Sequence, residues 1–179
     1  YLVDGDGRWV KDPDGQVQFE DLILFGINYG AGSGPQPPSD FVPGQSVPRF
    51  NEVALVAESI PQVGQTFAVN LFMHGKGDLQ ALSVPVLWND LMIDLVDMQA
   101  GAIMNAQSVP GIVLLTAPGT VDAALLGTSG VGIVGEGVLA TLTFRVLGEG
   151  DPELGLDQIS GRDRNNQDVA VSEMEVSDV

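Results

Sequence analysis

From about Asn51 onward, apolar and polar residues alternate in short runs that are separated by turn residues. In the clearest run, 138–147, one face carries Val138, Ala140, Leu142, Phe144 and Val146, and the other carries Leu139, Thr141, Thr143 and Arg145. The same period of two recurs in Phe67, Val69, Leu71 and Met73, and in Leu82, Val84, Val86 and Trp88. A period of two is typical of a strand with one face on the core.

Further strand candidates are 53–58, 92–98, 112–117, 121–126, 154–159 and 168–171. About nine short strands with turns between them predict a mainly β fold, a sandwich or a barrel. Long helical patterns are absent after Gly30, so we expect mostly antiparallel sheets.

A helical pattern precedes the strands. Leu22, Phe25 and Tyr29 recur at spacings of three and four before Gly30 ends the run, and Asp21 suits the positive end of a helix dipole. The chain therefore divides into a loop and helix at 1–30, a Pro/Gly/Ser-rich linker at 31–50, a sandwich at 51–172 and an acidic tail at 173–179.

Charge and composition narrow the range of partners. The 24 Asp and Glu outnumber the 7 Lys and Arg, giving a net charge of −17, which opposes binding to nucleic acid or to an anionic membrane and favours divalent cations. The absence of Cys excludes disulfides, thiolate metal sites and cysteine nucleophiles. No apolar run approaches the ~20 residues that cross a bilayer. Because the sequence begins at Tyr1, within an acidic motif, we expect a processed protein or part of a longer one.

Residues 12–21 are similar to a calcium loop of the EF-hand type. Asp12, Asp14 and Gly15 form a D-x-D-G motif, and Asp21 follows after five further residues at the start of the helix. In such a loop alternate acidic side chains converge on one cation, the glycine permits a sharp turn and the last carboxylate closes the coordination sphere.

The loop lacks an acidic residue at its first ligand position, which Val10 occupies. We expect Asp4 or Asp6 to supply it, and Gln16 to contribute its backbone carbonyl, with Glu20 as a second candidate for the closing place. The alternative is that the Asp-Gly pairs only form turns.

Two parts of the chain resemble known protein families. Residues 1–30 resemble one half of a dockerin, a calcium-loop-and-helix repeat, through D-x-D-G at 12–15, D-L at 21–22 and N-Y-G at 28–30. Residues 51–172 resemble a cohesin in VGQTFAV at 63–69, LQAL at 79–82, GEGVLATLTFRV at 135–146 and ISGRDRNNQDV at 159–169. The resemblance implies a nine-stranded jelly-roll sandwich without catalytic activity, which binds dockerins to assemble extracellular complexes such as cellulosomes.

The dockerin resemblance is incomplete, since a full dockerin carries two repeats and this chain shows one. The candidate partner-binding residues on the loop and helix are Phe19, Glu20, Phe25 and Tyr29. Phe19 and Glu20 stand where many dockerins have small hydroxyl residues, so the specificity of that family does not carry over.

A second acidic cluster lies near the end of the chain. Asp163, Asn165 and Asp168 present oxygen ligands at short spacing in a loop and are candidates for a second calcium site. A polar turn between the last two strands explains the same residues, and we favour that interpretation.

Catalysis and sugar binding have less support. His74 is the only imidazole, and no serine lies in a nucleophile-elbow motif. A carbohydrate-binding accessory module of a larger secreted enzyme is the alternative function. Its platform would need exposed aromatic residues such as Trp9, Tyr29 or Phe41, because Trp88 alternates with core positions.

We therefore expect a non-catalytic scaffolding or adhesion module, extracellular or at the cell surface, with calcium-dependent cohesin–dockerin-type assembly. Its partner would be a dockerin-like protein or a second copy, whose N-terminal helix docks on the sandwich of the next molecule. Docking within one chain is the alternative, because a linker gives a high effective concentration.

Overall fold

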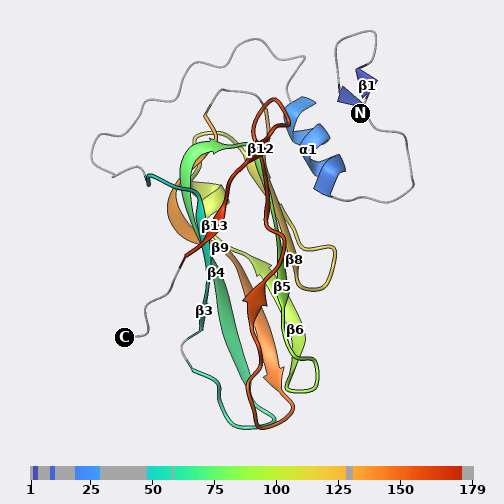
Figure 1. Cartoon of the computed structure of the whole chain (residues 1–179), viewed down its shortest axis with the longest axis vertical. Helices are drawn as coiled ribbons and strands as arrows, with labels where there is room; N and C mark the ends of the chain where they lie inside the picture. The colour runs from blue at the N-terminus through green and yellow to red at the C-terminus, as the bar shows by residue number, and fades with distance from the viewer. Residues whose placement is uncertain are drawn as a thin grey trace.

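A computed structural model describes residues 2–3, 9–10, 19–28, 48–57, 59–127 and 131–174, and its main body is a sandwich of two β-sheets (Figure 1). The N-terminal elements are β1 (Leu2–Val3), β2 (Trp9–Val10) and α1 (Phe19–Asn28). The sandwich comprises β3 (Glu52–Ala57), β4 (Thr66–Leu79), β5 (Ala81–Leu87), β6 (Ile93–Ala100), the 3-10 helix η1 (Ile103–Ala106), β7 (Gly111–Leu114), β8 (Thr120–Leu125), β9 (Ile133–Val146), β10 (Gly155–Leu156), β11 (Ser160–Arg162), β12 (Asp168–Val169) and β13 (Ser172–Glu173). Among the helices of the described residues, none is long and apolar enough to cross a membrane.

The first sheet has the order β13-β3-β4-β9-β6, and the second has the order β12-β11-β5-β8-β7 with β10 also paired to β5. Within the described part of the chain, every strand pair is antiparallel except β13 with β3. The prediction of a mainly β sandwich with mostly antiparallel sheets is therefore confirmed.

The core lies between the two sheets and follows the predicted alternation. Phe67, Val69, Leu71 and Met73 of β4 are buried, and so are Leu82, Val84 and Val86 of β5. Trp88 is half-buried and meets the Phe144 ring edge-on at 5.4 Å. As predicted, Trp88 therefore belongs to the core rather than to an exposed aromatic platform.

The predicted facing of β9 is wrong at one point. Leu71 pairs with Ala140 but Phe72 pairs with Val138, so Leu139 is an extra residue in a β-bulge. Leu139 is fully buried in the core, whereas Val138 lies beside Phe72 and is only half-buried. A prediction from strict alternation misses such an insertion, because one extra residue reverses the facing of the residues before it relative to those after it.

The C-terminal strands also differ from the expectation. The sequence predicts one strand over 154–159, but only Gly155–Leu156 pairs. In the run 168–171 only β12 forms, at Asp168–Val169, and a separate β13 follows that run at Ser172–Glu173. The alternation did not predict β11, whose central Gly161 packs in the close approach between Leu79 and Val169. Short strands with glycine in the middle carry little periodic signal.

The N-terminal helix forms close to the predicted place and lies alongside β8 at one end of the sandwich (Figure 1). It contacts β8 and β5 on the face of the second sheet that points away from the core. This placement turns the outer face of the sheet into an interface.

Candidate helix-docking interface

The outer face of the second sheet is built from small side chains. Ala81 of β5 pairs with Ala124 of β8, which pairs with Ile112 of β7, so the three form one row across the sheet. The next row runs from Ser83 to Asp122 to Leu114. Alanine at the centre of a sheet face leaves a shallow surface that a helix can approach closely.

The apolar face of α1 covers this surface. Leu22 is 3% exposed and Ile23 is 2% exposed, and both pack against Ala81 and Ala124. Partly buried Phe19, Ile112 and Leu114 complete this cluster, which we call the helix interface. It is separate from the core between the sheets, so β5 and β8 are buried on both faces along this part of their length.

A glycine allows the helix to approach the strand directly. A Cβ atom on Gly26 would lie 2.9 Å from the carbonyl oxygen of Leu125 and 3.6 Å from the Cβ of Ala124. Any side chain at this position must therefore move the helix away from β8. The N–H of Gly127 donates a 2.8 Å hydrogen bond to the carbonyl of Gly26, an acceptor that the end of a helix leaves without an intrahelical donor.

A buried glutamine holds the turn that makes this bond. Nε2 of Gln80 donates hydrogen bonds to the carbonyl oxygens of Leu125 at 2.6 Å and of Gly127 at 2.8 Å. The side chain of Gln80 is almost fully buried, so both bonds form away from bulk water. The buried side chain of Gln80 thereby fixes the position of the Gly127 N–H that bonds to α1.

Two polar side chains lie on the same sheet face, in the row next to Ala81 and Ala124. The hydroxyl of Ser83 donates a 2.6 Å hydrogen bond to Oδ1 of Asp122, and both side chains are buried. A buried carboxylate is stable only when donors surround it. The hydroxyl of Ser83 supplies one such donor from within the sheet.

Comparison with solved structures identifies the sandwich. A type II cohesin domain from the cellulosome of Acetivibrio cellulolyticus matches with a TM-score of 0.54 and 12% identity, over 70% of this chain and 92% of that one. The sixth cohesin of scaffoldin B from the same organism, solved with a mutant Cel5 dockerin, matches with a TM-score of 0.52 and 16% identity, over 70% and 94%. The sandwich has a cohesin-like fold.

The likeness extends beyond cellulosomes and concerns the fold alone. A non-cellulosomal cohesin from the hyperthermophilic archaeon Archaeoglobus fulgidus matches with a TM-score of 0.51 and 16% identity, over 69% of this chain and 86% of that one. No protein-family model and no curated protein matches the sequence. The predicted cohesin-like sandwich is therefore confirmed as a fold.

The predicted partner-binding residues fall on different sides of α1. Phe19 is half-buried against the helix interface of the cohesin-like sandwich, whereas Phe25 is 52% exposed. The side chain of Glu20 and the whole of Tyr29 lie outside the described residues. The side chains of α1 that pack on the helix interface are thus Phe19, Leu22 and Ile23, with Gly26 against β8, and they differ from the Leu22, Phe25 and Tyr29 series that predicted the helix. Leu24 is also buried, outside this cluster.

Most of the predicted calcium ligands cannot be placed. Asp4, Asp6, Asp12, Asp14 and Gln16 lie outside the described residues, and only Asp21, in the first turn of α1, lies within them. Among the described residues, no three His, Cys, Asp or Glu side chains are grouped so that they could hold a metal ion. The calcium loop at the N-terminus stays a prediction.

The second acidic cluster forms a tight turn. Oδ1 of Asp163 accepts hydrogen bonds of 2.8 Å from the N–H groups of Asn165 and Gln167, and Oδ2 accepts one of 3.3 Å from Asn165 Nδ2. Asp168 forms an ion pair with Arg162. The carboxylates are thus engaged within the protein, as in a polar turn, and calcium at Asp163, Asn165 and Asp168 stays a prediction.

His74 is held between two carboxylates on the outer face of the first sheet. Its Nδ1 lies 3.5 Å from Glu52 and its Nε2 lies 3.3 Å from Glu136. Both ring nitrogens are therefore directed at acidic side chains on neighbouring strands, which is an arrangement of cross-strand polar pairs.

Sequence reasoning missed the residues that receive α1, chiefly Ala81 and Ala124. A signal was present in β5, whose outward positions 81, 83 and 85 carry Ala, Ser and Pro while its inward positions 82, 84 and 86 carry Leu or Val. Small outward residues in a central strand indicate that something packs on that face.

Proposed function

We propose that this protein is a non-catalytic interaction module whose cohesin-like sandwich binds a short amphipathic helix on the outer face of β5, β7 and β8. The observation that carries the proposal is the packing of Leu22 and Ile23 of α1 against Ala81 and Ala124. A face that buries one helix of the same chain has the shape and polarity to bind another.

The external partner that fits best is a dockerin-like protein. Cohesin neighbours of the sandwich were solved as complexes with dockerins, including one from Acetivibrio cellulolyticus and one from Clostridium thermocellum. In this proposal α1 is a tethered occupant of the face, and a dockerin-like partner displaces it. The role that we propose for this binding is scaffolding or adhesion, outside the cell or at its surface.

Magnitudes favour docking of α1 within one chain at low concentration. Burial of two large aliphatic side chains contributes on the order of 3–6 kcal/mol. Association between molecules costs at least about 4 kcal/mol of translational and rotational freedom, which a tethered helix largely avoids. An external partner must therefore bury more surface than α1 does.

Self-assembly is the second mode that the same interface supports. Residues 29–51 join α1 to β3 and span up to about 75 Å when extended, so α1 can reach the sandwich of a second copy. Exchange of α1 between two copies keeps every contact of the interface and closes a dimer, whereas passing it to a third copy continues a chain. The populations of the dimer and of the longer chain both increase with protein concentration.

Calcium enters the proposal through the N-terminal unit. About 30 residues cannot build an adequate core alone, so an ion bound by the predicted loop would supply folding free energy to the segment that carries α1. Removal of calcium would then loosen α1 and leave the sandwich folded. Mass in solution by light scattering, in calcium and in excess chelator over a range of protein concentrations, tests both the ion and self-assembly.

The decisive experiment first releases α1 from the outer face of the second sheet and then blocks that face with a second substitution. Ile23→Asp in the full chain should release α1, and the opened face should bind residues 1–30 supplied as a fusion to a fluorescent protein in the presence of calcium. Adding Ala124→Arg should abolish this binding, because a long charged side chain then occupies the shallow surface formed by Ala81 and Ala124.

A matched substitution on the opposite sheet provides the control. Ala68 is exposed on the outer face of β4, so Ala68→Arg adds the same charge and bulk away from the helix interface. The proposal is wrong if the fusion fails to bind the Ile23→Asp chain, or if Ala124→Arg and Ala68→Arg affect its binding equally.

A further inference from the structure

A cleft lies at the end of the sandwich opposite α1, between the connection from β3 to β4 and the segment that follows β9 (Figure 1). Residues 60–63 form one wall and residues 146–150 the other, and the cavity measures about 490 Å³. This volume falls in the range of sites that receive a side chain or a small ligand. The cleft shares no residue with the helix interface, so it is independent of the proposed function.

The walls are fixed by backbone hydrogen bonds. The N–H of Gly64 donates to the carbonyl of Val146 at 2.8 Å, and the N–H of Val146 donates to the carbonyl of Gln65 at 2.9 Å. On the other side, the N–H of Leu147 donates to the carbonyl of Met92 at 2.8 Å. The cleft is therefore preformed, and a ligand need not pay to order it.

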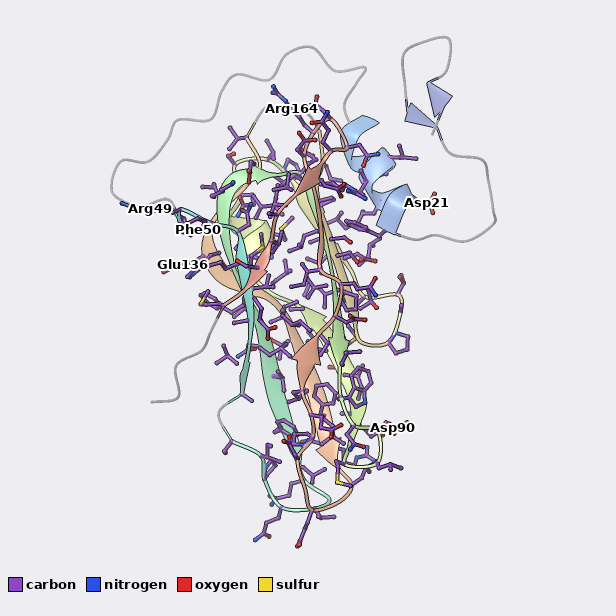
Figure 2. All side chains as sticks on the ribbon, in the orientation of Figure 1. Asp21, Arg49, Phe50, Asp90, Glu136 and Arg164 are labelled. Atoms are coloured by element: carbon purple, nitrogen blue, oxygen red, sulfur yellow. The ribbon has the colours of Figure 1, made fainter. Side chains whose placement is uncertain are left out.

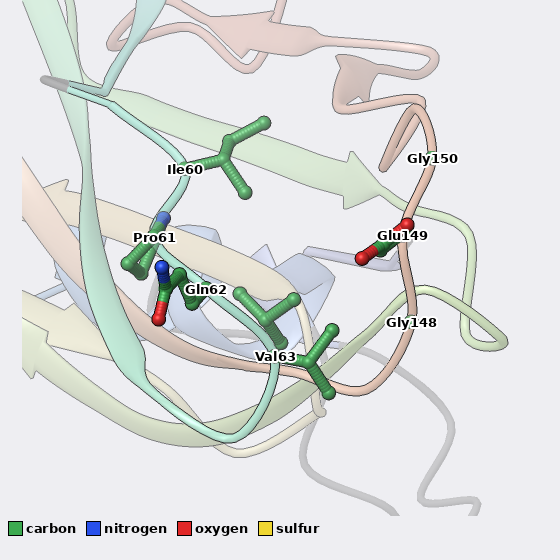
Figure 3. A pocket seen from close by; sticks show the side chains of 8 residues that line it. Ile60, Pro61, Gln62, Val63, Gly148, Glu149 and Gly150 are labelled. Atoms are coloured by element: carbon green, nitrogen blue, oxygen red, sulfur yellow. The ribbon is translucent and has the colours of Figure 1, made fainter.

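The two walls differ in chemistry. Ile60 is 48% exposed and Val63 is 51% exposed, which is unusual for large aliphatic side chains next to a cavity. Figure 3 shows Glu149 on the facing wall, with its carboxylate directed toward the side formed by these two residues. Among the described residues that line the cleft, Glu149 is the only charged one.

The surroundings add negative charge. Asp90, Asp151 and Glu153 are exposed in the adjoining loops. Two backbone hydrogen bonds join these loops: the N–H of Leu147 donates to the carbonyl of Met92 at 2.8 Å, and the N–H of Asn89 donates to the carbonyl of Pro152 at 2.7 Å. Figure 2 shows Asp90 at this end, whereas Arg49 and Arg164 lie toward the end that carries α1. Arg145, which precedes Val146 of the cleft, is opposed by Asp94 in the pairing of β6 with β9, and the acidic residues named above outnumber it. A cation is thus attracted to the cleft rather than repelled from it.

We propose that this cleft binds a lysine or arginine side chain of a partner protein. The aliphatic stem packs on Ile60 and Val63, and the cationic head meets Glu149, so both walls are used by one side chain. A second copy of this chain fits poorly as the source, because with a net charge of −17 it would bring its own acidic surface against this one. The partner segment is therefore basic and supplied by another protein.

The test uses the full-length, isotope-labelled chain and an acetylated, amidated hexapeptide of alternating lysine and alanine as the probe. Amide resonances of Ile60, Val63 and Glu149 should shift and saturate, and the dissociation constant should rise with salt. Glu149→Lys and Ile60→Ser should each weaken binding about fivefold or more, since one removes the charge and the other the apolar wall.

Two controls separate this site from general attraction to an acidic protein. Glu136→Lys makes the same charge change on the first sheet, where the Glu136 side chain is 70% exposed, and should leave the affinity unchanged. A peptide with glutamate in place of lysine should not bind. The proposal is overturned if shifts spread over the acidic surface without centring on the cleft, if both charge reversals weaken binding equally, or if the lysine peptide fails to bind.

Discussion

The N–H of Gly127, two residues past β8, donates a 2.8 Å hydrogen bond to the carbonyl oxygen of Gly26 in α1. This bond joins the N-terminal helix to the end of a sandwich strand. It forms because Gly26 has no side chain to hold the helix away from β8, and because Gln80 fixes the turn that contains Gly127. The docking of α1 therefore depends on backbone contact as well as on apolar burial.

Gly26→Leu should release α1 from the sheet. Leucine raises intrinsic helix propensity by nearly 1 kcal/mol relative to glycine, so the helix itself is not weakened. Its Cβ, however, would lie 2.9 Å from the Leu125 carbonyl oxygen, which is backbone and cannot move aside. Hydrogen exchange at the amides of residues 22–26 should become faster by at least tenfold, while exchange in β4 and β9 stays unchanged. Protection of α1 equal to that of the wild type would contradict the close approach.

Gly119→Ala should destabilise the sandwich far more than a glycine substitution normally does. Gly119 has φ +74°, and a Cβ there would lie 2.4 Å from Cζ3 of the Trp88 ring. Gly64 has φ +88° with nothing near its Cβ position, so Gly64→Ala measures the backbone cost alone, roughly 1–2 kcal/mol. Urea unfolding of both variants should give a free-energy loss for Gly119→Ala that exceeds that of Gly64→Ala by about 1–3 kcal/mol. Equal losses would mean that Trp88 is not held against this turn.

The sequence was sufficient for the long strands because their signal is physical and local. In 67–73 and 82–88 every second residue is large and apolar, because one face of each strand is in the core, and the structure buries these side chains, Trp88 in part. The β-bulge at Leu139 was not predictable in this way. An inserted residue changes facing without changing composition, and only pairing with Leu71 and Phe72 reveals it.

Leu139→Ala and Val138→Ala separate the two arrangements of β9. In the bulged strand Leu139 is fully buried, so its truncation should cost about 2–5 kcal/mol of unfolding free energy. Val138 lies on the half-exposed outer face, and its truncation should cost under about 1 kcal/mol. Chemical denaturation measures both. The reverse ranking would restore strict alternation and exclude the bulge.

The helix interface was harder to predict than the core for a related reason. The helix pattern predicted α1, but the stripe of Leu22, Phe25 and Tyr29 differs from the stripe that is buried, because Ile23 and Gly26 meet the sheet while Phe25 remains half-exposed. In a helix of ten residues with many apolar positions, periodicity leaves the buried face ambiguous. The small residues of β5 and β8 resolve it only once the strands are paired.

A carboxylate near the end of β4 gives the sandwich a defined dependence on pH. Partial burial raises the pKa of Asp78, but hydrogen bonds from Asn51 and Lys76 and the charge of Lys76 lower it more, so the pKa lies below its ordinary value of 3.8. Oδ1 accepts a 2.7 Å bond from Asn51 and Oδ2 lies 2.8 Å from Nζ of Lys76. Asn51 is itself buried, and its carbonyl accepts a hydrogen bond from the N–H of Ser172 in β13.

Asp78→Asn should therefore lower stability at neutral pH and matter less in acid. A carboxylate whose pKa is depressed by folding contributes its full stabilisation above its unfolded pKa, and loses it as the pH falls through the folded value. The difference in urea midpoint between wild type and Asp78→Asn should accordingly be constant above about pH 5 and shrink below about pH 4. Asp90→Asn, in an exposed loop, serves as the matched control and should shift the midpoint little throughout. A difference for Asp78→Asn that persists unchanged into acid would mean that its charge does not hold Asn51 and Lys76 in place.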